Sequence, residues 1–329
     1  MTETIEVLKP LKTWSHLAGR RRRPSEYEIV SKNLHASMNP TRPAFELDPD
    51  LPMNVWYRTY RDGSPLQHPD WNAFSDPDEI IYRTYNLMQD GQETYIEGLL
   101  DEFNRREYDT GIDPEWLKVL ARLHAPARYL FHTLQIASAY LGQVAPASTI
   151  TNCAYFQAAD QLRLVSHTAY RTSELSHSHP DLGFGKEERG LWENDPSWQG
   201  FRELMEKVLA TYDWGEAFAA LNLVAKPAVD ECLLRTLGAE ARRHGDTLMA
   251  LLIDGQLRDS DRSRRWTETL VRFALQEPAN AAPLQHWVAK WTPLAEQAIQ
   301  AYCAPLPDGG TLAAEAIERL HTFQSSLGV

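Results

Sequence analysis

The sequence predicts an all-α protein, and three observations support this class. After residue 76, apolar residues recur at the three- and four-residue spacing of amphipathic helices. The alternation of apolar and polar residues that indicates strands does not occur. Several helical patterns begin with Ser or Asp followed by Pro and an acidic residue, which is a favourable helix start. With 329 residues, the chain is long enough for one large helical domain.

Residues 1–76 are expected to form an extended, irregular N-terminal arm. Prolines recur through this stretch and leave few windows long enough for a helix. The arm is nevertheless rich in aromatic residues, which disordered segments lack. Aromatic and arginine side chains are enriched at the centres of interfaces, so we expect the arm to lie largely on another subunit. The residues expected at this interface are Trp14, Arg21, Arg22, Tyr27, Trp56 and Tyr57. The alternative is an arm folded over its own domain.

Residues 77–329 are expected to form the helical domain. Its helices are predicted at 77–104, 113–122, 127–144, 148–176, 195–212, 213–257, 266–276, 283–302 and 312–327. Pro227 should kink or split the longest of them, because proline inside a helix removes a hydrogen bond. A polar loop is expected at 180–195 and a charged turn at 258–265.

The stretch 152–177 looks like the metal-bearing helix of a diiron protein that has lost its ligands. Such a helix needs Glu-x-x-His, since positions three apart lie on one helical face and can bind one iron. The usual local form is Asp-Glu-x-Arg-His, and the matching residues are 160–164 (DQLRL). Gln161 and Leu164 therefore stand where the carboxylate and the imidazole would be. An amide and a leucine cannot hold an iron pair.

A second degenerate site is predicted at residues 239–244 (AEARRH). On the same template, Glu240 keeps the carboxylate and Arg243 replaces the histidine. Glu240 and His244 also share one helical face, so the spacing alone does not exclude a ligand pair. The one literal Glu-x-x-His is Glu174 to His177, at the end of its predicted helix.

Two other functions stay open at this point. An independent metal enzyme would use Glu174, His177, Glu240 and His244, with Glu216 and Glu231 as further carboxylates. Its difficulty is placement, because two equivalent Glu-x-x-His pairs on inward faces are required. A helical protein that binds a small aromatic molecule would rest only on abundant Trp and Tyr, which are ordinary core and interface residues.

Charge and cysteine content narrow the partners and the compartment. The formal net charge of -12 argues against nucleic acid, which needs a basic face. Arg20 to Arg23 form the one basic block, either a clamp on an acidic partner or a solvated run. The three cysteines are widely spaced in apolar helical segments, as expected of a reduced, cytoplasmic protein. The N-terminus lacks a signal-peptide core, and no window reaches the ~20 apolar residues of a membrane span.

Several segments of the sequence resemble those of a known protein family. They are residues 11–17 (LKTWSHL), 24–31 (PSEYEIVS), 82–85 (YRTY) and 90–92 (DGQ). They are similar to the β subunit of bacterial multicomponent monooxygenases, in the toluene/benzene/o-xylene monooxygenase branch. The resemblance covers nearly the whole chain and implies a ferritin-like fold that carries no iron, no cofactor and no catalytic residue.

The resemblance also implies a place in a larger enzyme. The hydroxylase of this family is an α2β2γ2 assembly in which α carries the diiron centre. It inserts one atom of dioxygen into an aromatic ring, with electrons from NADH through a reductase and a ferredoxin and with a small effector protein. The β subunit would be a scaffold that packs against α and brings two αβ units together.

Overall fold

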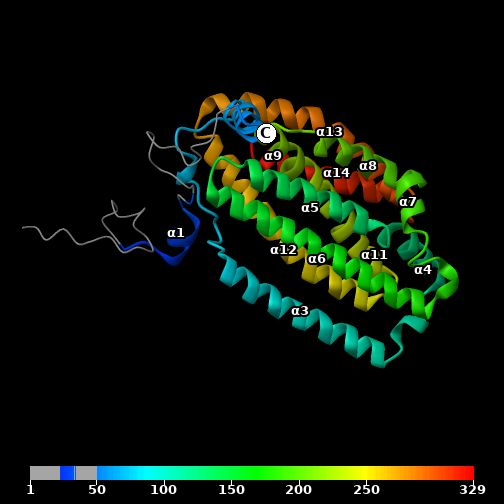
Figure 1. Cartoon of the computed structure of the whole chain (residues 1–329). Helices are drawn as coiled ribbons and strands as arrows, with labels where there is room; N and C mark the ends of the chain where they lie inside the picture. The colour runs from blue at the N-terminus through cyan, green and yellow to red at the C-terminus, as the bar shows by residue number, and fades with distance from the viewer. Residues whose placement is uncertain (1–22, 33, 35–49) are drawn as a thin grey trace, which may run out of the picture.

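The computed structural model describes residues 23–32, 34 and 50–329 (Figure 1). Trp14, Arg21 and Arg22 lie outside the described residues, as do Arg20 and half of the predicted arm. All regular secondary structure in the described ranges is helical, which confirms the predicted all-α class. Among the helices of these ranges, none is long and apolar enough to cross a membrane.

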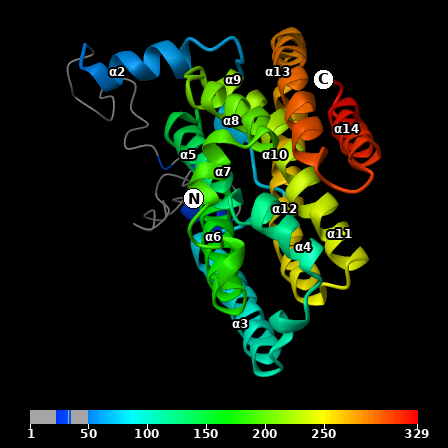
Figure 2. The ribbon, with the colours of Figure 1, turned by 90° about the vertical axis from the view of Figure 1, so that its right-hand side faces the viewer.

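Long helices build the body of the molecule. They are α3 (Tyr82–Arg105), α5 (Ala127–Val144), α6 (Ser148–Ser178), α12 (Thr247–Ala274), α13 (Ala281–Cys303) and α14 (Gly309–Ser326). Shorter helices join them: α4 (Pro114–Val119), α7 (Glu188–Asn194), α8 (Pro196–Leu209), α9 (Trp214–Phe218), α10 (Lys226–Val229) and α11 (Leu237–Arg243). In Figure 2, α3, α5 and α6 lie on one side of the molecule, and α13 and α14 lie on the other. The predicted loop 180–195 was wrong in part, because it contains α7.

Acidic caps set the starts of several helices as predicted. The Asp113 carboxylate accepts a hydrogen bond from the Glu115 amide at the start of α4, and Asp195 accepts one from Ser197 at the start of α8. Asp76 behaves differently. Its carboxylate accepts from the amides of Asp78 and Ile80 in a tight turn, so α3 begins only at Tyr82. The expected start at residue 77 was therefore too early.

A buried helical stretch runs through the centre of the fold. It comprises α9, α10 and α11 with two intervening π-helical segments, Ala219–Ala225 and Asp230–Thr236. Every residue from 217 to 234 is buried, as expected for a helix that is surrounded by the core. Pro227 lies in α10 directly after the first π-helical segment, whose changed hydrogen-bond register accommodates the missing amide hydrogen.

The boundary between this central stretch and α12 differs from the prediction. The central stretch ends at Arg243, and Gly245 takes a left-handed conformation with φ of 72°. Asp246 then caps α12 by accepting from the Met249 amide. Helix α12 continues through 258–265, so the charged turn predicted there was wrong. The charges of this segment belong to a helix whose Asp259 and Arg262 are buried.

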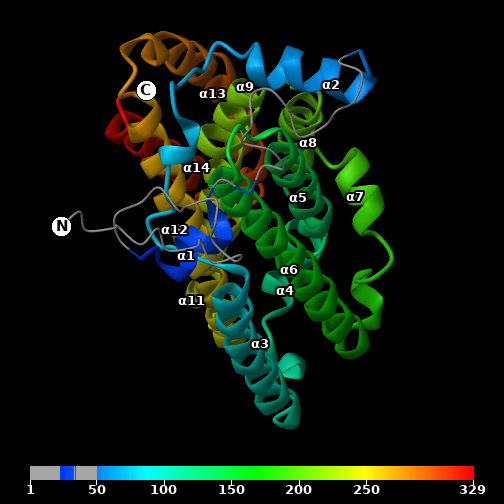
Figure 3. The same ribbon diagram turned by 60° about the vertical axis from the view of Figure 1, so that its left-hand side comes forward.

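The described part of the arm packs on its own domain and is partly helical. Two short helices, α1 (Glu26–Ser31) and α2 (Pro52–Tyr57), lie within it. Helix α1 begins with a capping box between Ser25 and Glu28, and α2 begins with Pro52, which is well tolerated at the first position of a helix. Figure 3 shows α2 across the end of the bundle near α9. Trp56 Nε1 donates to Tyr140 Oη at 3.1 Å. Tyr27 is only 4% exposed and its hydroxyl accepts from the Asp76 amide, so Tyr27 serves the chain's own core rather than an interface.

Candidate functional site

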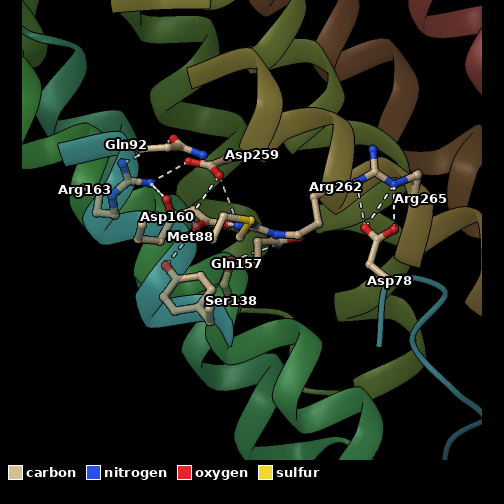
Figure 4. Close-up of polar contacts among 12 residues, drawn as sticks. Asp78, Met88, Gln92, Ser138, Gln157, Asp160, Arg163, Asp259, Arg262 and Arg265 are labelled. Carbon is tan, nitrogen blue, oxygen red and sulfur yellow. Dashed lines mark hydrogen bonds and ion pairs between the residues drawn. The ribbon is translucent and has the colours of Figure 1, made fainter. Parts of the chain in front are cut away.

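Two reciprocal ion pairs join helices α6 and α12 (Figure 4). Arg163 of α6 donates from Nη1 to Asp259 Oδ2 of α12 at 2.7 Å. Arg262 of α12 donates from Nη2 to Asp160 Oδ2 of α6. Each helix thus supplies one acid and one base, and each base reaches the acid of the other helix. All four side chains are largely buried, so both pairs are shielded from solvent.

This pairing identifies the second degenerate ligand segment. Residues 259–263 (DSDRS) have the same Asp-x-x-Arg spacing as 160–164 (DQLRL). On the Asp-Glu-x-Arg-His template, Ser260 and Ser263 stand at the ligand positions of α12. The repeated spacing was visible in the sequence, but it was missed because 258–265 was interpreted as a turn.

Glu240 and Arg243, the predicted second segment, lie elsewhere. Glu240 is fully buried, and Arg243 Nη1 lies 3.1 Å from its Oε1 without hydrogen-bond geometry. Arg243 also approaches Asp308, in the connection that leads into α14. Neither residue contacts Asp160 or Arg163 among the described interactions. The assignment of Glu240 and Arg243 as the counterpart of Gln161 and Leu164 is therefore corrected to Ser260 and Ser263.

The carboxylates and histidines of the alternative metal site do not converge. Glu174 accepts from Asn104 and Arg171, while His177 is exposed and contacts its own helix through the Ser173 carbonyl. His244 stacks on Trp116 with ring centroids 4.9 Å apart.

The remaining two carboxylates have partners of their own. Lys290 Nζ and Trp291 Nε1 both donate to Glu216 Oε1. Arg264 and Arg319 donate to the buried Glu231. Within the described ranges, no group of three or more His, Cys, Asp or Glu residues could hold a metal ion.

Helix α3 is hydrogen-bonded to the two reciprocal ion pairs between α6 and α12. Tyr85 Oη donates to Asp160 Oδ1 at 2.9 Å. Gln89 Nε2 donates to both Asp160 Oδ1 and Asp259 Oδ1, each at 3.0 Å. Arg163 in turn donates to Glu93 on α3 at 2.6 Å. One buried network therefore connects α3, α6 and α12.

Electrostatics of the network follow from its burial. Burial raises the pKa of Asp160 to about 6, and the Asp259 charge adds to this rise while Arg262 opposes it. Burial and the Asp160 charge also raise the pKa of Tyr85, so its hydroxyl remains a hydrogen-bond donor at neutral pH. The two arginines hold Asp160 and Asp259 in place, and the charges of these four groups cancel when all of them are ionised.

Neutral polar groups and an internal cation fill the interior beside the ligand positions. Ser260 Oγ and Lys226 Nζ both donate to Asp230 Oδ2 at 2.6 Å, and Lys226 is 3% exposed. Gln157 and Asn222 are hydrogen-bonded to each other by their side-chain amides. A diiron site needs four carboxylates and two histidines facing inward, so this donor set does not fit one.

Fold and site together define a class, namely a large helical bundle whose potential ligand positions hold an amide, a leucine and two serines. A model of the methane/phenol/alkene hydroxylase family matches residues 56–278. Because this match covers more than half of the chain, the chain belongs to the methane/phenol/alkene hydroxylase family.

Relatives and solved structures agree with this assignment. The chain is 52% identical to the hydroxylase component subunit beta of the toluene-4-monooxygenase system of Ectopseudomonas mendocina, over 98% of this chain and 99% of the relative. It is 24% identical to the phenol 2-monooxygenase oxygenase component DmpL of Pseudomonas sp. (strain CF600), over 91% and 88% of the two chains.

Among solved structures, a chain of toluene 4-monooxygenase with toluene in its resting active site matches with a TM-score of 0.85 and 53% identity, over 93% of this chain and 98% of that chain. Phenol hydroxylase from Pseudomonas sp. OX1 matches in fold, with a TM-score of 0.82, 21% identity and coverage of 100% and 98%. These likenesses confirm the predicted ferritin-like fold.

Proposed function

We propose that this chain is the structural β subunit of the hydroxylase component of a toluene-type monooxygenase. The observation that carries the proposal is 52% identity to such a subunit over almost the full length of both chains. The side chains at Gln161, Leu164, Ser260 and Ser263 support it, because none of these four is a carboxylate or an imidazole. The ring hydroxylation by dioxygen and NADH-derived electrons would take place on a separate diiron α subunit.

The role of this chain's own residues would be mechanical support. The buried network joins three helices with charge-assisted hydrogen bonds, which are directional and resist reorientation. The apolar residues of the central stretch share one buried core with residues of α6 and α12. A rigid bundle of this kind can hold a neighbouring subunit in one position without taking part in chemistry.

The partners would be the α and γ subunits and a second αβ unit, with the ferredoxin, the reductase and the effector protein acting on the assembly. The arm belongs to this part of the proposal. Trp56 and Tyr57 are half-buried on their own domain and keep part of their rings available, and the neighbouring Met53 and Val55 are exposed. Trp14, Arg21 and Arg22 stay proposed interface residues. Three buried free thiols are consistent with a cytoplasmic protein.

Co-expression of this chain with the other hydroxylase subunits tests the proposal. We expect a stable complex with equal amounts of α and β, and we expect its iron to follow α when the subunits are separated. The chain purified alone should bind no stoichiometric iron. About two irons per chain in that preparation, the content of a dinuclear site, would refute the structural role.

A further inference from the structure

Exposed large apolar side chains are concentrated on one side of the molecule. The layer formed by α3, α5 and α6 carries Tyr82, Leu87, Tyr95, Ile136, Tyr155, Leu162 and Tyr170. Beyond residue 170, the described chain exposes only Tyr212 among its large hydrophobic residues. Figure 1 shows α5, α6 and α3 side by side. Clustered exposed apolar residues of this kind mark interaction sites rather than ordinary surface.

The outer surfaces of α5 and α6 also lack charge. The only charged residue of α5 is Arg128, which is half-buried at the start of the helix. The four charged residues of α6, namely Asp160, Arg163, Arg171 and Glu174, are all buried or half-buried. Charged residues make up 24% of the whole chain, so two helices without an exposed charge are unusual. Charge depletion with tyrosine enrichment is typical of the buried centre of a subunit interface.

The size of this surface, here called the α5–α6 face, suits a stable complex. Helices of 31 and 18 residues are roughly 46 and 27 Å long at ~1.5 Å per residue. With a width of ~10 Å for each helix, the α5–α6 face covers roughly 700 Å². A stable interface buries ~800 Å² on each partner, so this face and its border suffice.

The border of the α5–α6 face indicates which partner covers it. Glu97 and Asp101 on α3 are exposed, and they line a groove of about 520 Å³ between α3 and α6 together with Tyr170. No ion pair of Glu97 or Asp101 occurs within the described residues. A second copy of this chain would bring another net charge of -12 against this acidic border, and such self-repulsion disfavours association. A different subunit with basic residues around an uncharged helical surface fits better.

We propose that the α5–α6 face binds an uncharged helical surface of the diiron subunit, with basic side chains of that subunit meeting the acidic border on α3. This inference rests on the proposed function, because it names the surface through which the proposed complex forms. The apolar residues at its centre would supply most of the affinity, and the acidic border would orient the partner.

A matched pair of substitutions tests the α5–α6 face in the co-expressed complex. Ser166 on α6 is exposed and Thr269 on α12 is half-buried, and both are helical hydroxyl residues that donate to the carbonyl four residues earlier. We expect Ser166→Glu to weaken binding of this chain to the diiron subunit by more than ~30-fold, because it buries an unpaired charge. Leu162→Glu should act in the same way. Thr269→Glu should change the dissociation constant by less than ~3-fold.

The three variants should remain folded, because Leu162 and Ser166 are exposed in the single chain and Thr269 is only half-buried. Circular dichroism and the Tm of the isolated variants check this point. If the wild-type complex forms and all three variants bind equally well, the α5–α6 face is not the contact surface. If the isolated chain forms dimers that Leu162→Glu dissociates, a second copy covers the face and the inference is wrong. If the wild-type chain binds no diiron subunit at all, the proposed function fails instead.

Discussion

Helices α8 and α3 both lie on the outside of the bundle, but they are attached to it by different forces. Helix α8 packs closely on α13 through Trp198, Phe201 and Tyr302, which are fully buried. Helix α3 is held by hydrogen bonds to the buried ion pairs and by one small apolar cluster around Ile96 and Leu100. Open grooves of about 690 and 520 Å³ flank α3 on its two sides. Buried aromatic side chains fill the contact between α8 and α13, whereas the grooves beside α3 leave space that a neighbour can fill.

The largest effect should come from breaking the polar attachment. Arg262→Met removes the partner of the buried Asp160 carboxylate, and loss of one member of a buried pair costs ~3–5 kcal/mol. The double variant Asp160→Asn with Arg262→Met should recover much of this loss, because no unpaired charge remains. Urea unfolding of the wild type, both single variants and the double variant measures the coupling. Additive losses would show that the two residues do not depend on each other.

The second effect is a change of stability with pH, to which the buried groups Asp160 and His124 contribute in opposite directions. The Asp160 pKa of about 6 lies above its usual 3.8, so the folded chain binds this proton more readily than the unfolded chain. Its contribution to stability is present below pH 3.8 and is lost as the pH rises through 6. Burial, with a smaller contribution from Arg171, lowers the pKa of His124 from 6.5 to about 3. The stability linked to His124 is present above pH 6.5 and is lost as the pH falls toward 3.

Substitutions separate these two groups. From pH 7 to pH 4, the stability of the wild type relative to Asp160→Asn should rise, by an amount on the order of 2 kcal/mol. The stability of the wild type relative to His124→Gln should fall over the same range. Asp259, Arg262, Arg163, Tyr85 and Gln89 are the groups that face Asp160 in the network. Parallel pH profiles for all three proteins would contradict both assignments.

The third effect tests the close packing of α8. A Cβ at Gly200 would lie 2.6 Å from the Cα of Ala298, where backbone meets backbone. Gly200→Ala should therefore destabilise the fold by ~1–3 kcal/mol, since overpacking forces the two helices apart. The midpoint of urea unfolding measures this loss. A neutral or stabilised variant would mean that α8 and α13 can separate without cost.

The smallest expected effect is an increase in stability, and it serves as the matched control for Gly200→Ala. Nothing lies within 4 Å of a Cβ built at Gly91, in the middle of α3 and beside its groove. Gly91→Ala should stabilise the isolated chain by ~0.5–1 kcal/mol through helix propensity alone. A loss of stability in the same urea experiment would show that α3 packs more tightly than the open grooves indicate.

Local signals in the sequence predicted a large part of this fold. Asp195 followed by Pro196 predicted a helix start, and the lost ligands at Gln161 and Leu164 were visible on a known template. The same reasoning failed at 259–263. A dense run of charged residues suggests an exposed segment, and the sequence does not show that the partners of these charges lie on a distant helix. The π-helical segments were not predictable either, since they depend on packing on all sides of the central stretch. Pro52 was interpreted as a helix breaker although it begins α2.

The reciprocal ion pairs have a mechanical consequence. Arg163 pairs with Asp259 and Arg262 pairs with Asp160, so the two helices run in opposite directions through this contact. Sliding one helix past the other by one turn, ~5.4 Å, would break both pairs at once. The two ion pairs therefore fix the register of α6 relative to α12 and resist sliding of one helix along the other. If a bound neighbour displaced α6, α12 would have to move with it, because their register is fixed by the ion pairs. A displacement at the surface of the bundle would thus be transmitted to its interior.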